Sequence, residues 1–160
     1  MEAARPATAE DVPRLAELCR LARAELGSQE RGGAVFVARE ARPEPVDESL
    51  RAMVEGPGTR VVAGTVDGVI LGYATARVED LRDGIRLGVI EDLFVEEGGR
   101  QVGVGEAMMA ELLPWFRAQG CTGVDALALP GVRATKNFFE ESGFTARLIT
   151  MHHRLRDAPA

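Results

Sequence analysis

Apolar residues near the N-terminus recur every three or four positions, which predicts a helix from about Asp11 to Leu26. The apolar face of this helix consists of Val12, Leu15, Cys19, Ala22 and Leu26. A second, shorter helix is expected near Asp47 to Glu55. The glycine- and proline-containing segment from Gly27 to Val46 predicts a long loop, with a short strand at Ala34–Ala38. Such a loop could cover a substrate site or serve only as a solvated connector.

Three runs with strand character follow. Thr59–Val66 and Val69–Glu79 are joined by Asp67-Gly68, a dipeptide typical of tight hairpin turns. The third run, Ile85–Val95, follows another Asp-Gly pair. Because consecutive strands with short connections pair in antiparallel fashion, we expect three successive antiparallel strands.

Helices and strands alternate in the last third of the chain. The expected elements are a helix over Val104–Gln119, a strand over Gly123–Leu129, a helix over Arg133–Ser142 and a final strand over Phe144–Leu155. Antiparallel strands followed by strand–helix–strand units are typical of a mixed sheet. The sequence therefore predicts one α/β domain over residues 1–160, a mixed, mostly antiparallel sheet flanked by helices.

Composition and charge narrow the function. The 160 residues include 19 basic and 25 acidic side chains, and a net charge of −6 argues against a nucleic-acid or anionic-membrane partner. The N-terminus lacks the apolar stretch of a secretory signal, and no apolar run approaches the roughly 20 residues that span a bilayer. Two cysteines, Cys19 and Cys121, indicate reduced thiols in a cytoplasmic protein. No metal is expected, because the histidines and cysteines lack zinc-site spacing.

The glycine-rich segment Glu96–Gly105 carries the strongest chemical signal. It connects an expected strand to the start of an expected helix, where free backbone N–H groups and the positive end of the helix dipole bind phosphate. Other phosphate loops fit less well: a dinucleotide fingerprint requires glycine where Met108 stands, and a P-loop requires lysine where Glu106 stands.

The run Arg100-Gln101-Val102-Gly103-Val104-Gly105 resembles the pyrophosphate loop of the GNAT family of N-acetyltransferases. Leu93-Phe94-Val95 resembles the strand end that binds the pantetheine arm in that family, and Phe138–Phe144 resembles its FYxxxGF helix ending. The resemblance implies the GNAT fold and acetyl-CoA (coenzyme A) as co-substrate. The cofactor-binding residues it implies are Leu93, Phe94, Val95, Arg100, Gln101, Val102, Gly103, Val104, Gly105, Glu106, Lys136 and Phe139. Lys136, or Arg133 one turn away, would meet the ribose 3′-phosphate, unless both simply belong to a solvated helix face.

The resemblance also implies a catalytic base, for which Glu91 and Asp92 are the candidates. Strand alternation places these two carboxylates on opposite faces. Glu91 shares the face of Leu93 and Val95, which is the face of the family's base, and the surrounding run is similar to that of polyamine acetyltransferases. Glu91 is therefore predicted to deprotonate the acceptor through a water molecule. Its alternative role is that of a partly exposed edge carboxylate.

Phe139 stands where many family members carry a tyrosine that protonates the departing thiolate. This leaves two functional hypotheses: an N-acetyltransferase acting on a primary amine of a small molecule or peptide, or a catalytically weak acyl-CoA-binding regulatory module. A homodimer is the candidate assembly, although the sequence does not determine the oligomeric state.

Overall fold

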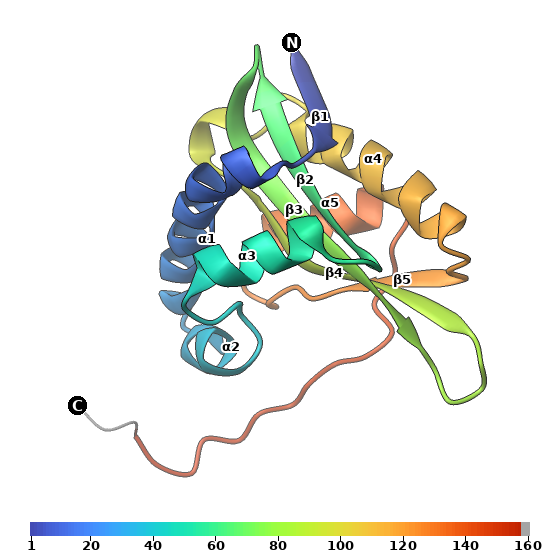
Figure 1. Cartoon of the computed structure of the whole chain (residues 1–160). Coiled ribbons are helices and arrows are strands. Elements are labelled where there is room, and N and C mark those ends of the chain that lie inside the picture. The colour runs from blue at the N-terminus through green and yellow to red at the C-terminus, as the bar shows by residue number, and fades with distance from the viewer. Residues whose placement is uncertain (158–160) are drawn as a thin grey trace.

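The computed structural model describes residues 1–157 and contains a five-stranded sheet between two layers of helices (Figure 1). The strands are β1 (Glu2–Pro6), β2 (Thr59–Val66), β3 (Val69–Asp80), β4 (Arg86–Val95) and β5 (Gly123–Ala126). They lie in chain order across the sheet; the first four are antiparallel, and β5 runs parallel to β4. The predicted mixed, mostly antiparallel α/β sheet is confirmed.

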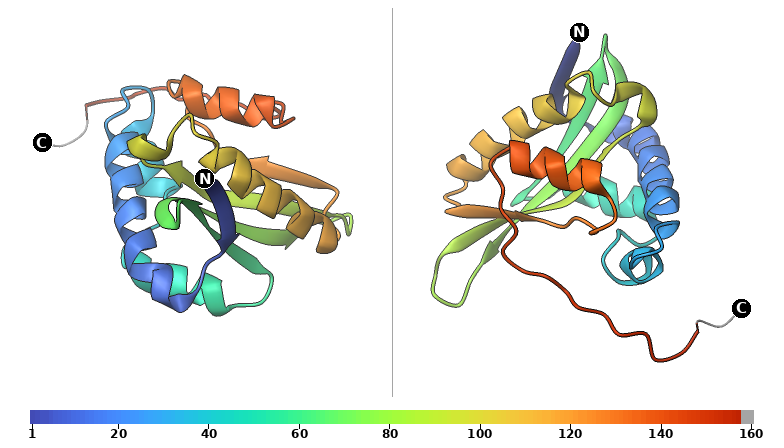
Figure 2. Two further views of the ribbon diagram at one scale, coloured as in Figure 1. Left: turned by 90° about the horizontal axis from the view of Figure 1, so that it is seen from above. Right: turned by 180° about the vertical axis from the view of Figure 1, so that it is seen from behind.

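Helices cover both faces of the sheet, as Figure 2 shows from above. They are α1 (Val12–Gly27), α2 (Gly33–Arg39), α3 (Val46–Glu55), α4 (Val104–Ala118) and α5 (Arg133–Glu141). On one face, α1 and α3 bury Leu15 and Leu50 against a cluster that includes Tyr73. On the other face, α4 and α5 contribute Phe116 and Phe139 to a second cluster. Each face of the sheet therefore has its own apolar core.

Three expected elements differ from the structure. Residues 34–38, predicted as a strand, lie in α2, which packs against α1. Residues 144–155, predicted as a final strand, form no helix or strand within the described chain and run away from the sheet (Figure 1). The strand predicted over Gly123–Leu129 ends at Ala126, because pairing with β4 stops there. In addition, β1 was not predicted, because its sequence Glu-Ala-Ala-Arg-Pro shows no apolar alternation.

Candidate active site

β4 and β5 separate at one point in the sheet. Their parallel pairing ends with Ile90 opposite Ala126, and the rest of β4 pairs with β3. The N–H of Glu96 donates to the carbonyl of Leu71 at 2.8 Å. Because the peptide groups of an antiparallel strand point alternately to either side, those of Leu93 and Val95 point away from β3. This edge of β4 therefore presents backbone groups toward the side that β5 leaves.

β4 contains an extra residue at the same point. Thr75 lies opposite Asp92 and Ala76 opposite Ile90, so Glu91 has no partner on β3. Such a β-bulge interrupts the regular alternation of side chains between the two faces. Both Glu91 and Asp92 consequently reach one guanidinium, that of Arg42. The predicted placement of the two carboxylates on opposite faces is therefore wrong.

Glu91 and Asp92, together with Arg42, Thr75 and Arg77, form a carboxylate cluster. Arg42 is its buried centre. Its side chain is 5% exposed, and it donates from Nε to Asp92 at 2.8 Å and from Nη2 to Glu91 at 3.2 Å. The hydroxyls of Thr75 and Ser49 accept its other hydrogen bonds, at 3.0 and 2.5 Å. Burial alone would lower the pKa of Arg42, but Asp92 and Glu91 raise it above its ordinary value. The guanidinium therefore stays charged.

The two carboxylates differ in their access to solvent. The side chain of Asp92 is 10% exposed and accepts a hydrogen bond from the hydroxyl of Tyr73 at 3.1 Å. Burial raises the pKa of Tyr73 well above its usual value, so this hydroxyl remains a donor. Glu91 is 32% exposed and also pairs with Arg77 at 2.7 Å. Asp92 is thus enclosed, whereas water can reach Glu91.

The start of α4 forms a second feature of the site. Gly103, which precedes the helix, has a φ of 91°, a conformation that favours glycine. The first helical hydrogen bond runs from the N–H of Ala107 to the carbonyl of Gly103, and no side chain caps this end in the described structure. The N–H groups of Val104, Gly105 and Glu106 therefore have no helical partners. Such groups, with the helix dipole, favour an anion.

Gly105 is required for packing between α4 and α5. A Cβ atom at this position would lie 2.9 Å from Cε1 of Phe138. Phe138 packs in turn on Phe139, with ring centroids 5.6 Å apart, and Phe139 lies 5.2 Å from Phe144. The aromatic segment of α5 therefore supports the first turn of α4, which links the two sequence motifs in space.

Comparisons with known proteins identify the family and the fold to which this arrangement of β4 and α4 belongs. A family model described as the acetyltransferase (GNAT) family matches residues 17–144. The chain belongs to the GNAT family. Among solved structures, a mutant of the BH1408 protein from Bacillus halodurans superposes with a TM-score of 0.81 at 21% identity, covering 96% of this chain and 99% of that one. The fold of this GNAT chain thus recurs almost over its full length.

One further relative of this GNAT chain is described as an aminoglycoside acetyltransferase, and one further similar structure contains a bisubstrate analogue of coenzyme A. The aminoglycoside N(6′)-acetyltransferase type 1 of Stenotrophomonas maltophilia is 28% identical over 82 residues, 49% of this chain and 54% of that protein. The chain thus matches about half the length of that curated relative. The structure of AAC(6′)-Iy with a bisubstrate analogue, CoA-S-monomethyl-acetylneamine, has a TM-score of 0.73 at 17% identity and covers 98% of this chain and 99% of that one.

The GNAT structure brings most of the predicted cofactor residues together. Leu93, Phe94 and Val95 end β4, and the loop before α4 begins a few residues later. Arg100 is held by Glu25 at 2.8 Å and by the carbonyl of Val95 at 2.7 Å, and its guanidinium lies over the ring of Phe94. The predicted loop thereby attaches to the end of β4 and to α1.

Lys136 has a partner on its own helix. It pairs with Glu140 at 2.6 Å, and its side chain is 54% exposed. This geometry agrees equally with a solvated helix face and with a lysine that could exchange its partner for a phosphate.

The sequence did not indicate three polar members of the carboxylate cluster, Arg42, Thr75 and Arg77. Arg42 lies 49 and 50 positions from Glu91 and Asp92, so no local spacing connects them. Arg42 lies in the Gly27 to Val46 segment, which was considered as a cover for a substrate site. This position was the one signal in the sequence that connected Arg42 to the site.

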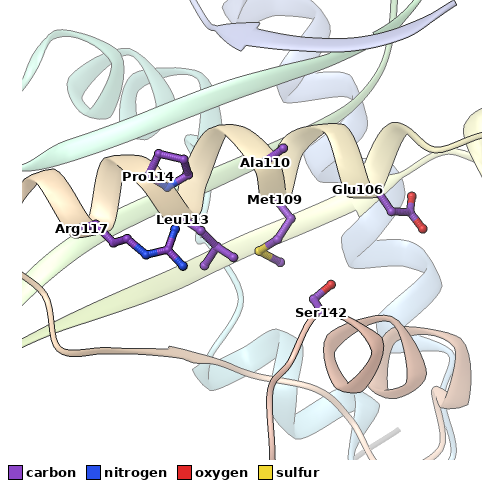
Figure 3. A pocket seen from close by; sticks show the side chains of 7 residues that line it. All are labelled: Glu106, Met109, Ala110, Leu113, Pro114, Arg117 and Ser142. Carbon is purple, nitrogen blue, oxygen red and sulfur yellow. The ribbon is translucent and has the colours of Figure 1, made fainter.

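A shallow groove of about 290 Å³ lies between α4 and the end of α5 (Figure 3). It is lined by Glu106, Met109, Ala110, Leu113, Pro114, Arg117 and Ser142. Of the predicted cofactor residues, Glu106 is the one that lines it. The groove therefore adjoins the start of α4 but contains none of the carboxylate cluster.

Metal-binding clusters and membrane-spanning helices are both absent from residues 1–157. No group of three or more His, Cys, Asp or Glu side chains in that range is placed to hold a metal ion. None of the helices in the same range is long and apolar enough to cross a membrane.

Proposed function

We propose that this GNAT chain transfers an acetyl group from acetyl-CoA directly to a primary amine of a small molecule or peptide. One observation carries the proposal: β4 separates from β5 immediately before Glu91–Val95, and the uncapped start of α4 follows on the same chain segment. A free strand edge beside an anion-binding helix end suits a ligand that has an amide-containing arm and a pyrophosphate.

Acetyl-CoA would lie along this segment. The outward peptide groups of Leu93 and the outward N–H of Val95 would bind the pantetheine arm, with Phe94 between them in the strand, because the carbonyl of Val95 already accepts from Arg100. The N–H groups of Val104, Gly105 and Glu106 would face the pyrophosphate, and Arg100, Gln101, Val102 and Gly103 would shape the loop. Phe139 would support the arm by packing, and Lys136 would meet the 3′-phosphate after releasing Glu140.

Glu91 is the proposed general base. The acceptor amine is protonated in water and must lose that proton before nitrogen attacks the thioester carbonyl. Glu91 is more accessible than Asp92, and each of its oxygens has a lone pair left beyond its ion pair with arginine. The C–N bond forms and the C–S bond breaks. The ammonium nitrogen loses two protons in all: one passes through water to Glu91, and the other passes through water to the departing thiolate.

The acceptor is proposed on chemical grounds. The relative described as an aminoglycoside acetyltransferase and the similar structure with CoA-S-monomethyl-acetylneamine support an amine on a small molecule. The net charge of −6 favours a cationic one. We assign the reaction to the cytoplasm, because Cys19 and Cys121 are both free thiols.

Phe139 favours a second candidate, an acyl-CoA-binding regulatory module. Its ring is 7% exposed among other aromatic rings and has no proton to donate. If thiolate departure required a side-chain acid at this position, the chain would bind the cofactor without turnover.

Two measurements on the full chain separate these candidates. Calorimetry with coenzyme A tests binding, and mass spectrometry after incubation with acetyl-CoA tests transfer to an aminoglycoside, a linear diamine and a peptide with a free N-terminus. We expect binding together with an acetylated product 42 Da heavier than at least one acceptor, since acetylation adds about this mass. Binding without any product would favour the module, and absence of binding would refute both candidates.

A further inference from the structure

The two carboxylate oxygens of Glu91 are occupied by different arginines. Oε2 lies 3.2 Å from Nη2 of Arg42, and Oε1 lies 2.7 Å from Nε of Arg77. An alkyl amine is itself a cation in neutral water, and like charges repel each other at such short range. One of the two arginines must therefore move away before an acceptor's ammonium group can approach Glu91.

Arg42 is held in place. Its side chain is 5% exposed, and besides Glu91 it contacts Asp92, Thr75 and Ser49. Moving this guanidinium would leave the enclosed carboxylate of Asp92 without its cation, which is costly in a buried site. Arg42 therefore remains the partner of Glu91 Oε2.

Arg77 is the arginine that can move. Its side chain is 40% exposed, and ion pairs with this much solvent contact contribute little free energy. Its Nη1 also donates to Glu79 at 3.2 Å. Glu79 lies two positions further along β3 and so shares a face of the sheet with Arg77. Arg77 can thus release Glu91 and keep a counter-ion on its own strand.

The bulge in β4 brings Arg77 and Glu91 together. Arg77 lies opposite Val89 in the register of β3 and β4, and Glu91 is the extra residue two positions further along β4. A long side chain can reach such a diagonal neighbour across an antiparallel pair. The contact covers the one oxygen of Glu91 that Arg42 leaves open.

We propose that Arg77 is a specificity-determining residue that holds the place of the acceptor's ammonium group at Glu91 until an acceptor binds. The assignment depends on the acetyl transfer to an amine proposed above. An alkylammonium displaces Arg77 toward Glu79 and replaces its charge, whereas a neutral aromatic amine brings no such charge and is disfavoured. The apparent affinity for the acceptor is reduced by the fraction of molecules in which Arg77 still covers Glu91.

Calorimetry with diaminobutane measures this displacement on the full chain saturated with coenzyme A. Arg77→Gln should bind the diamine about threefold more tightly than the natural protein, which is the size expected for the loss of an exposed ion pair. Arg86→Gln is the matched control, because Arg86 is also 40% exposed but pairs with Asp80, outside the carboxylate cluster. Its affinity should be unchanged. Circular dichroism monitors the fold of each variant.

Glu79→Gln separates displacement from a general effect of charge. Without its second partner, Arg77 should stay on Glu91, and the diamine should bind about threefold more weakly. In an Arg77→Gln background the same change should have little effect, whereas a general charge effect would be as large as before.

Unchanged affinity in Arg77→Gln, an equal gain in Arg86→Gln, or an equal loss from Glu79→Gln with and without Arg77 would each overturn the proposal. Mass spectrometry of the same proteins with acetyl-CoA measures transfer separately. Acetylated diamine together with unchanged affinity in Arg77→Gln would refute the displacement alone. Tighter binding by Arg77→Gln without any product would support the displacement and refute the proposed transfer.

Discussion

The Nε atom of Arg42 lies 2.8 Å from a carboxylate oxygen of Asp92, although the two residues are 50 positions apart. This contact joins the segment between α2 and α3 to the bulge in β4. It encloses Asp92 and leaves the neighbouring Glu91 as the carboxylate that solvent can reach.

Replacing Arg42 should destabilise the fold strongly. In Arg42→Met, the carboxylate of Asp92 would stay buried without its cation, which costs about 3–5 kcal/mol when one partner of a buried pair is removed. Urea unfolding measures this loss. Arg39→Met is the control, because Arg39 is 75% exposed and its pair with Glu40 is worth under about 1 kcal/mol. Equal stability of the two variants would contradict the structural role of Arg42.

Glu91→Gln should lower the single-turnover rate of amine acetylation by roughly 10²-fold, because the amide cannot take up the amine proton. The affinity for coenzyme A should be unchanged in calorimetry. Asp92→Asn is the comparison: it should act mainly on stability, measured by urea unfolding. A larger rate loss in Asp92→Asn than in Glu91→Gln would transfer the role of base to Asp92.

A negative charge at Gly105 should weaken coenzyme A binding. Any side chain there meets the ring of Phe138, so the comparison is made in a Phe138→Ala background, where Gly105→Glu and Gly105→Gln differ in charge alone. The glutamate opposes the pyrophosphate at the start of α4, and calorimetry should show at least about tenfold weaker binding than for the glutamine variant. Equal affinities would mean that the pyrophosphate lies elsewhere.

Phe139→Tyr should change the acetylation rate little. The thiol of coenzyme A has a pKa near that of other thiols, roughly 8.5, so water can protonate the departing thiolate. Rates of the two proteins are compared at saturating acetyl-CoA. If the natural protein binds acetyl-CoA without turnover and the tyrosine variant is active, the enzyme hypothesis fails and the regulatory module remains.

The ion pair between Glu44 and Arg20 should be visible in a pH titration. Hydrogen bonds from Arg20 and from the N–H of Val46 lower the pKa of Glu44 from 4.5 to about 2. A lowered carboxyl pKa stabilises the fold above the unfolded value, and this contribution is lost as the pH falls from about 4.5 to 2. Carbon-detected NMR should find the Glu44 pKa raised in Arg20→Gln; an unchanged value would exclude the pair in solution.

Most of the fold could be predicted because its signals are local. The face of α1, the Asp-Gly hairpin and the start of α4 each depend on residues a few positions apart. The elements that were predicted wrongly, or not predicted, depend on partners far away in the sequence. Residues 34–38 have strand-like composition but form α2 against α1, and the five residues of β1 become a strand because β2 pairs with them.

In the candidate site, too, the features with local signals could be predicted and those that depend on distant partners could not. The loop from Arg100 to Gly105 could be recognised from its own sequence. The relation between Glu91 and Asp92 could not, because the bulge is defined by the register of β4 against Thr75 and Ala76. Arg42 could not be assigned either, since its partners come from β3, β4 and α3.

The bulge keeps the apolar residues of β4 on one face of the sheet. Ile90 lies opposite Ala76 and Leu93 opposite Ala74, and all four belong to the core beneath α4 or pack against it. Glu91 is the extra residue between them. Deleting it would let Asp92 follow Ile90 as in a regular strand, so Leu93 would stay opposite Ala74 and the register of β4 would not change. The sheet of this GNAT chain would survive the deletion, and the carboxylate proposed as its base would be lost.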